Sequence, residues 1–193
     1  LLPKFQMNVI LEELKLIFEK VHPTKVLING DLKHEFGSIL NQEWKEVFVL
    51  IDFLLKEMSE VIIIKGNHDP IIKPIADKKG IEIVNSYRVG DVIIVHGDKL
   101  VETTAKRIII GHEHPAIRLK EAGKSEKYKC FLKGKWKRKE LIVVPSFNPL
   151  LEGTDVLKEK LLNPFLEDVK NCEVYVVGDK GEVFYFGKIK DII

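Results

Sequence analysis

The chain contains the run Val61-Ile62-Ile63-Ile64-Lys65-Gly66-Asn67-His68-Asp69, in which four aliphatic residues lead into a polar cluster. Short aliphatic runs of this kind are typical of strands that are buried on both faces of a sheet. A second run, Val26-Leu27-Ile28, leads in the same way into Asn29-Gly30-Asp31. In α/β sheets the carboxyl ends of the strands converge on one edge, where ligands bind. We therefore expect the two polar clusters to lie at such an edge.

Two helical patterns alternate with these strands. Apolar residues recur at three- and four-residue steps across residues 4–21 and again across residues 42–58. Strands that alternate with helices indicate right-handed crossovers and a parallel sheet. The first half of the chain therefore has the pattern of an α/β structure.

The second half is richer in strands. Short strands are predicted at residues 81–84, 86–89, 92–96, 107–110, 127–132, 139–144, 173–177 and 182–187. Turns such as Val89-Gly90-Asp91 are typical of hairpins, and one helix is predicted between Val156 and Val169, with Pro164 breaking or restarting it. Two packed β-sheets flanked by helices would accommodate both halves. We see no linker or repeat, and we expect a single α/β domain over residues 1–193.

Composition excludes several classes of protein. With 45% hydrophobic and 31% charged residues in 193, the chain is neither disordered nor membranous, and the mixed first twenty residues do not resemble a signal peptide. Cys130 and Cys172 lack metal-ligand spacing, so we expect two buried thiols in a reducing compartment. A soluble, cytoplasmic protein is expected. Abundant Lys, Glu and Ile with only two Gln are also found in thermophilic proteins.

Four predicted strands end in related polar clusters. These are Gly30-Asp31, Gly66-Asn67-His68-Asp69, His96-Gly97-Asp98 and Gly111-His112-Glu113-His114. Carboxylate, amide and imidazole ligands together suit Mn, Fe, Zn or Ni more than Mg or Ca. Two such ions need a bridging carboxylate, for which Asp31 is the natural candidate.

Each of these residues alone also has an ordinary structural interpretation. Asp31 could be a turn former or helix cap, Asn67 a left-handed turn residue, and His96 a hydrogen-bonded structural residue. His112 and His114 are one residue apart, so on an extended segment they would share a face. The coincidence of four clusters in one small chain favours a common metal site.

The order of these motifs resembles that of the calcineurin-like metallophosphoesterase superfamily. A closer similarity, to archaeal relatives of the DNA-ligase-associated phosphoesterases, rests on four segments: Leu2-Pro3-Lys4-Phe5-Gln6, residues 30–36, residues 111–117 and Pro145-Ser146-Phe147-Asn148. The resemblance implies a metal-dependent phosphoesterase with two divalent transition-metal ions, Mn being preferred. Phosphodiesters are the favoured substrates, and phosphomonoesters are the alternative. A non-catalytic scaffold of the same fold is the rival interpretation. The sequence indicates no oligomeric state.

The resemblance also implies which residues hold the metals. Asp31 would bridge the two ions. Asn67, His96 and His112 would complete one site, and His114 would serve the other.

It further implies roles at the phosphate. His68 would act beside the scissile phosphate as general acid or transition-state donor, and Asp69 would orient it. His34 would contact the phosphate, although it could equally be an exposed loop histidine. Glu113 and Asp98 are expected behind the ligands or on the surface.

One family motif is missing. Members of the superfamily open with Asp-x-His on their first strand, and no Asp-x-His precedes Asp31 here. Since residue 1 is leucine, we expect an upstream strand that this sequence lacks, lying beside the strand at Val26–Ile28. The alternative is a protein with one complete and one broken metal site.

Residues 118–139 form a basic stretch with ten Lys or Arg residues and two acids, and it includes Trp136. Such a hairpin could follow a nucleic-acid backbone and stack a base. It could equally be a solvated hairpin with Trp136 packed on its own sheet. Both interpretations stay open at this point, since a net charge of +2 implies no general attraction to nucleic acid.

Overall fold

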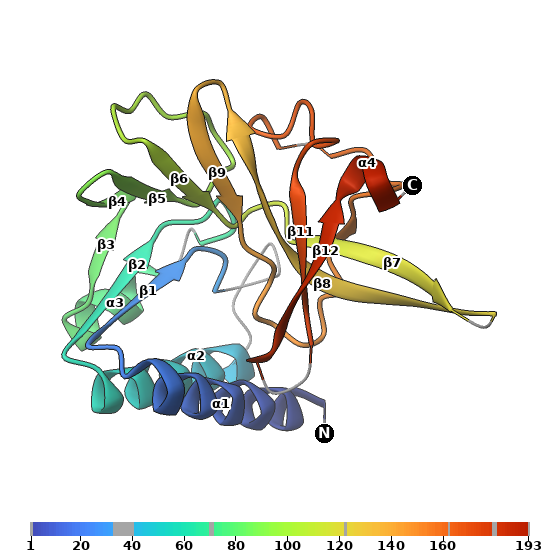
Figure 1. The fold of residues 1–193 in the computed structure, drawn as a ribbon. Helices are drawn as coiled ribbons and strands as arrows, with labels where there is room; N and C mark the ends of the chain where they lie inside the picture. The colour runs from blue at the N-terminus through green and yellow to red at the C-terminus, as the bar shows by residue number, and fades with distance from the viewer. Residues whose placement is uncertain are drawn as a thin grey trace. The chain divides into compact units, whose positions relative to one another are not determined.

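The computed structural model describes residues 2–32, 41–69, 72–121, 123–161, 163–178 and 181–192. The chain is mixed α/β, with two sheets flanked by helices (Figure 1). Its internal contacts divide it into two compact units, Leu1–Tyr87 and Arg88–Ile193. Among the residues so described, no helix combines the length and apolarity that crossing a membrane requires.

The first unit contains a parallel three-stranded sheet. Its strands lie in the order β1 (Lys25–Asn29), β2 (Glu60–Ile64) and β3 (Glu82–Val84). Helices α1 (Leu2–Val21) and α2 (Asn41–Glu57) confirm the two predicted helices. The short helix α3 (Lys73–Lys79), which was not predicted, ends at Gly80 in a left-handed conformation.

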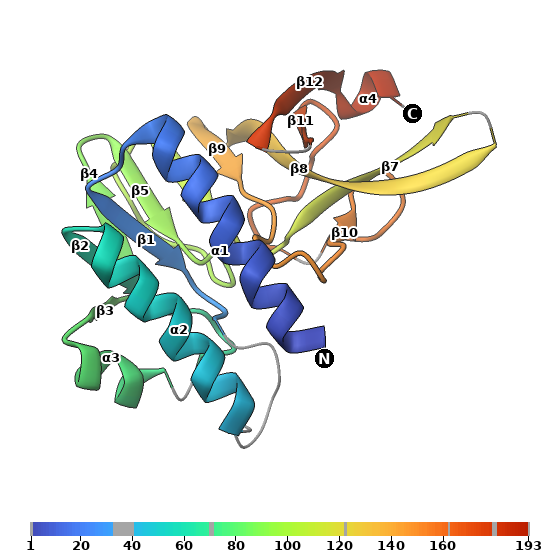
Figure 2. The same cartoon turned by 90° about the horizontal axis from the view of Figure 1, so that it is seen from below.

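One apolar cluster joins these helices to the sheet. Val26, Ile28, Val61 and Ile63 alternate along β1 and β2 and therefore point to the same face. Residues of α1, α2 and α3 pack in the same cluster, and Figure 2 shows α1 and α2 side by side along the sheet. Burial of this face holds β1 and β2 in place, and the first two polar clusters follow directly after these strands.

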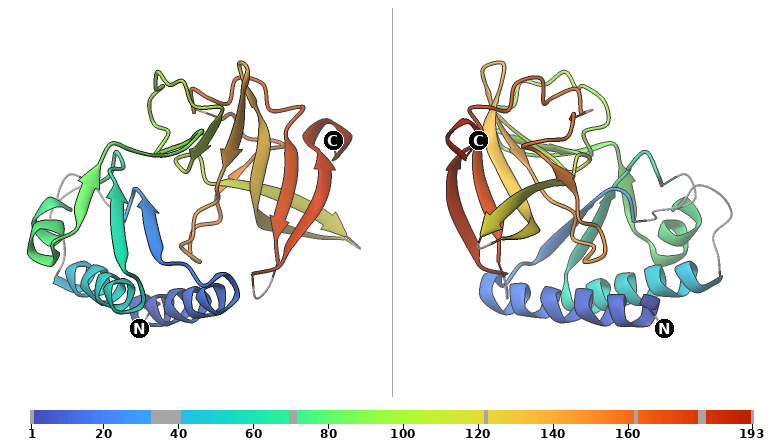
Figure 3. Two further views of the ribbon diagram at one scale, coloured as in Figure 1. Left: turned by 60° about the vertical axis from the view of Figure 1, so that its left-hand side comes forward. Right: turned by 90° about the vertical axis from the view of Figure 1, so that its right-hand side faces the viewer.

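The second unit is built on a branched sheet. Its main path runs β10-β7-β8-β9-β6-β5-β4, and β11 pairs with β8 and β12 (Figure 3). The bounds are β4 (Ser86–Val89), β5 (Val92–Val95), β6 (Arg107–Ile110), β7 (Pro115–Glu121), β8 (Lys124–Trp136), β9 (Lys139–Val143), β10 (Thr154–Asp155), β11 (Glu173–Val177), β12 (Val183–Lys188) and α4 (Ile189–Ile192). β5, β6 and β9 are parallel neighbours, which places their carboxyl ends at one edge.

Four features of this unit differ from the sequence prediction, and one is the short helix α4, which was not predicted. β7 and β10 were not predicted, and β8 is longer than expected because it pairs with three strands, β7, β9 and β11. The helix predicted between Val156 and Val169 is wrong, because the described residues there form turns. The side chains of Asp155 and Asn163 each accept a backbone N–H two residues later, a local bond that competes with helix formation.

The core of this unit includes Ile108, Ile110 and Leu132. Cys130 and Cys172 are both buried and unpaired, which confirms the expected buried thiols. Burial raises the pKa of Cys130 to about 12 and that of Cys172 to about 11. Both thiols are therefore protonated and unreactive at neutral pH.

Gly134 of β8 packs closely against Cys172, which leaves no room for a larger side chain at residue 134. A Cβ at residue 134 would lie 2.4 Å from the Cys172 Sγ, so Gly134→Ala should lower the free energy of unfolding by about 1–3 kcal/mol. Cys172→Ala removes the sulfur, so the added methyl group should be tolerated in the double variant. Urea denaturation of the unsubstituted protein, the two single variants and the double variant measures the coupling free energy between residues 134 and 172. Strictly additive losses would show that the two residues do not compete for the same space.

Candidate metal centre

Asp31 follows β1 in an unusual backbone conformation. Its φ is 53°, and the preceding Gly30 has φ 79°. Left-handed backbone is uncommon outside glycine, and Asp and Asn tolerate it best. The Oδ1 of Asp31 accepts the backbone N–H of His68 at 3.0 Å. The first two polar clusters thus meet, as the strand order predicted.

Gly66 allows this close approach. A Cβ on Gly66 would lie 2.3 Å from the Asp31 Oδ1 and 2.4 Å from the Asp31 backbone nitrogen. No side chain fits at residue 66 unless the Asp31 loop moves. The glycine in the Gly-Asn-His-Asp motif is therefore required by packing.

Asp69 links the loop that contains Asp31 to the loop that contains Gly66. It is 2% exposed, and its Oδ2 accepts the backbone N–H groups of Asp31 at 2.7 Å and of Gly66 at 3.0 Å. A carboxylate that accepts two N–H groups holds both segments in place. Sequence reasoning assigned Asp69 to orienting His68, and that assignment stays a prediction. Its bonds to Asp31 and Gly66 had no signal in the sequence.

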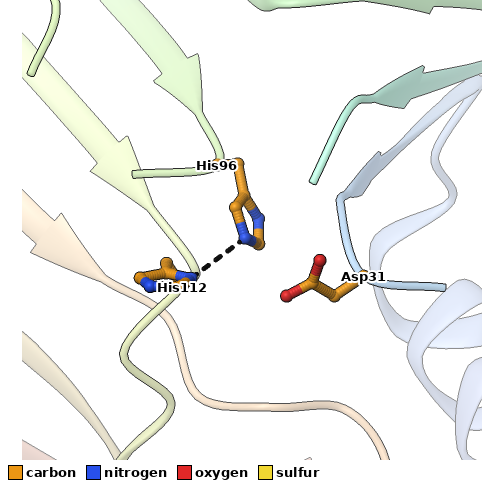
Figure 4. A group of neighbouring side chains, drawn as sticks. All are labelled: Asp31, His96 and His112. Carbon is orange, nitrogen blue, oxygen red and sulfur yellow. Dashed lines mark hydrogen bonds between the residues drawn. The ribbon is translucent and has the colours of Figure 1, made fainter. Parts of the chain in front are cut away.

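His96 and His112 form the corresponding pair in the second unit. They follow the neighbouring parallel strands β5 and β6, and the backbone N–H groups of Gly111 and His112 donate to the His96 carbonyl at 2.9 and 3.0 Å. Nδ1 of His112 lies 3.2 Å from Nε2 of His96 (Figure 4). Two nitrogens that bind one ion at about 2.0–2.1 Å, at roughly a right angle, would be about 3 Å apart. The pair is spaced for a shared cation.

His114 ends a turn. Its backbone N–H donates to the Gly111 carbonyl at 3.3 Å, and its φ is 51°. The argument that His112 and His114 share a face of an extended segment is therefore wrong, because the segment between them is not extended. The His114 carbonyl accepts the Thr154 N–H at 2.9 Å, which anchors the end of the turn.

Glu113, between the two histidines, is buried rather than on the surface. It is 8% exposed, and its Oε2 accepts the backbone N–H of Asn163 at 3.0 Å. Asn163 is itself 4% exposed. Sequence reasoning did not find Asn163, because it lies fifty residues from Glu113 and outside any recognisable motif. The predicted phosphate contact His34 lies outside the described residues.

Several lysines of the basic stretch bind the chain's own loops. Lys127 donates to the Gly153 carbonyl at 3.1 Å, and Lys139 donates to the Ala105 carbonyl at 2.8 Å. Trp136 packs its ring 4.9 Å from that of Phe165. These contacts favour the structural interpretation for Trp136 and these two lysines.

Other basic residues of the stretch are exposed. Lys133 and Lys135 lie on β8, and Lys137 and Arg138 form the turn to β9. Figure 1 shows β7 and β8 as a long hairpin, with the turn to β9 at the opposite end of β8. These four cations, on the last part of β8 and its turn to β9, are the part of the basic stretch that could meet a polyanion.

Three solved structures illustrate the likeness to known proteins. The nuclease MPE of Pseudomonas putida shares 17% identity with a TM-score of 0.65, over 91% of this chain and 78% of that one. A Vps29 double mutant from Entamoeba histolytica shares 14% identity (TM-score 0.39; 93% and 89% covered). Vacuolar Protein Sorting 29 from Cryptosporidium parvum shares 17% (TM-score 0.33; 85% and 97% covered). No curated protein matches the chain in sequence.

The nuclease MPE likeness shows a shared fold. The sequence profile described as calcineurin-like phosphoesterase matches residues 4–180, which is most of the chain. That match agrees with the motif order from Asp31 to His114 and with the two sheets flanked by helices. The chain belongs to the calcineurin-like phosphoesterase family.

Proposed function

We propose that this protein is a metal-dependent phosphoesterase that hydrolyses phosphodiesters at a centre of two divalent transition-metal ions, with Mn²⁺ preferred. The observation that carries the proposal is the pair of ring nitrogens of His96 and His112, 3.2 Å apart at the ends of adjacent strands. Each ring alone is compatible with a structural role. Together, at this spacing, they offer two ligands to one ion.

Four of the proposed ligands follow four different strands, β1, β2, β5 and β6. Asp31 is proposed as the bridge, joined at one ion by Asn67, His96 and His112 and at the other by His114. A carboxylate with two imidazoles is a donor set that suits Mn, Fe, Zn or Ni. The strained backbone of Asp31, whose N–H is held by the Asp69 carboxylate, supports the proposal, because strain of this kind concentrates at functional positions. A single metallophosphoesterase domain over residues 1–193 belongs to the same proposal.

Bound ions would supply Lewis acidity and lower the pKa of a bound water toward neutrality. The remaining steps fall to the chain's own residues. His68 would hold a proton for the leaving oxygen as the bond from phosphorus to that oxygen breaks and the bond to the attacking oxygen forms. Asp31 and Asp69 would keep the His68 loop in place, since the Asp31 carboxylate already accepts the His68 backbone N–H.

The preference for diesters rests on two supports. A protein of the same fold is called a nuclease, and nucleases act on phosphodiesters. The exposed cations Lys133, Lys135, Lys137 and Arg138 could also contact a nucleic-acid backbone. Similarity to archaeal relatives of the DNA-ligase-associated phosphoesterases belongs to the same proposal. A reducing, cytoplasmic setting agrees with two buried, unpaired thiols.

Metal dependence is the most direct prediction of this proposal. The full-length protein should hydrolyse bis(para-nitrophenyl) phosphate with added Mn²⁺ and lose this activity with EDTA. Asp31→Asn and His96→Ala should each lower kcat/KM at least about 100-fold, because each removes a ligand. Isothermal titration calorimetry should show weaker Mn²⁺ binding in both variants. Normal Mn²⁺ affinity in His96→Ala would contradict the ligand assignment.

His68→Ala is the companion variant. It should keep Mn²⁺ affinity and lower kcat, by about 100-fold or more for esters with poorly acidic leaving groups, because general acid catalysis contributes most there. Val89→Ala, at an exposed apolar position of β4, serves as the control for both experiments. Full activity of His68→Ala on every ester would remove His68 from the mechanism.

Asp69 should act as a positioning residue. Asp69→Ala leaves the Asp31 and Gly66 N–H groups without their acceptor, so we expect Mn²⁺ affinity to fall about 10–100-fold. Asp69→Asn keeps one acceptor oxygen, so its Mn²⁺ affinity should be much closer to that of the unsubstituted protein. Calorimetry measures the affinity, and urea denaturation reports separately on folding. If the unsubstituted protein, Asp69→Ala and Asp69→Asn bind Mn²⁺ with equal affinity, Asp69 contributes only to stability.

A further inference from the structure

We propose that the loop of residues 145–153 is a binding subsite for an aromatic base carried by the phosphodiester, with Phe147 as its stacking surface. This inference rests on the proposed function and narrows its substrate class to esters of nucleosides. Pro145-Ser146-Phe147-Asn148 was singled out in the sequence, and no ligand or catalytic role has been assigned to it.

The loop begins beside the histidine pair. β9 is the parallel neighbour of β6, with Val143 opposite Ile110, and the Val144 N–H donates to the Ile110 carbonyl at 2.8 Å. β6 in turn neighbours β5. The chain therefore leaves β9 at the same sheet edge from which His96 and His112 emerge. Adjacent strands are about 4.8 Å apart, so the start of the loop is close to His112.

The loop also ends beside the same motif. The Thr154 N–H donates to the His114 carbonyl at 2.9 Å, and the Thr154 hydroxyl donates to the Glu113 carbonyl at 3.1 Å. A Cβ on Gly153 would lie 2.2 Å from the His114 carbonyl oxygen, so the two backbones are in direct contact. The loop thus begins beside Ile110 and ends beside Glu113 and His114, on either side of His112 in the sequence.

The backbone around Phe147 is fixed. The Lys129 ammonium donates to the carbonyls of Ser146, at 2.9 Å, and of Asn148. The Ser146 Oγ accepts the Asn148 N–H at 3.2 Å, and the Asn148 Oδ1 accepts the Leu150 N–H at 3.0 Å. Bonds on both sides of Phe147 hold its backbone before any ligand arrives. Such preorganisation lowers the entropy lost on binding.

Phe147 itself is 43% exposed. A single exposed apolar residue is ordinary on a protein surface. Phe147 differs because its loop is anchored on both sides and is tied to the candidate metal ligands. At a phosphoesterase site, an apolar ring can only meet the organic part of the ester. Of such groups, a nucleobase offers the flat face that stacks best on phenylalanine.

The test compares two diesters with the same leaving group. The para-nitrophenyl ester of thymidine monophosphate carries a base, and methyl para-nitrophenyl phosphate does not. Phe147→Ala should lower the ratio of kcat/KM for the thymidine ester to that for the methyl ester about tenfold, mainly through KM. Phe147→Tyr should keep the ratio. Val89→Ala, exposed on β4, is the control and should also keep it.

The outcomes separate this inference from the proposed function. If the full-length, unsubstituted protein with Mn²⁺ hydrolyses neither ester, the phosphoesterase proposal itself fails. If it hydrolyses both and Phe147→Ala leaves their ratio unchanged, the subsite is wrong while the enzyme assignment stands. A ratio that falls equally in Phe147→Ala and Phe147→Tyr also overturns the stacking role. Circular dichroism confirms that each variant is folded.

Discussion

Parallel pairing of β5, β6 and β9 is the constraint on which the second half of the candidate site depends. β6 is hydrogen-bonded to β5 on one side and to β9 on the other. The carboxyl ends of the three strands therefore cannot separate without breaking the sheet. Because the strands end in register, His96, His112 and the loop of residues 145–153 emerge at one edge. Buried Ile108, Ile110 and Val143 hold this register, since a shift of one residue would expose them. The apolar core thereby sets the positions of the polar residues.

Backbone strain adds to this constraint at one candidate ligand in each unit. Asp31 and His114 both have left-handed backbone, which costs roughly 1–2 kcal/mol for most residues with a side chain. Hydrogen bonds offset that cost: from the Asp31 N–H to the Asp69 carboxylate, and from the Thr154 N–H to the His114 carbonyl. Gly66 and Gly153 provide the space for these close approaches. Two candidate ligands are thus held in conformations that an unconstrained chain would avoid.

Local patterns predicted the long helices, most strands and the two-sheet class, because apolar periodicity reports directly on burial. They failed where long-range pairing decides, because β7 forms by pairing with β8 and β10 forms by pairing with β7. The site shows the same division. Motif order pointed to the clusters that contain Asp31, His96 and His112, while the bonds of Asp69 to the Asp31 loop, and of Glu113 to Asn163, join segments that no local pattern relates. The turn at His114 was misjudged because spacing alone does not reveal φ.

The central claim is that side chains from separate loops hold a common metal ion, and anomalous diffraction from Mn²⁺-soaked crystals tests it most directly. The account predicts a manganese peak at bonding distance from the facing ring nitrogens of His96 and His112 and from a carboxylate oxygen of Asp31. A well-ordered crystal with these side chains visible and no manganese between them would contradict it.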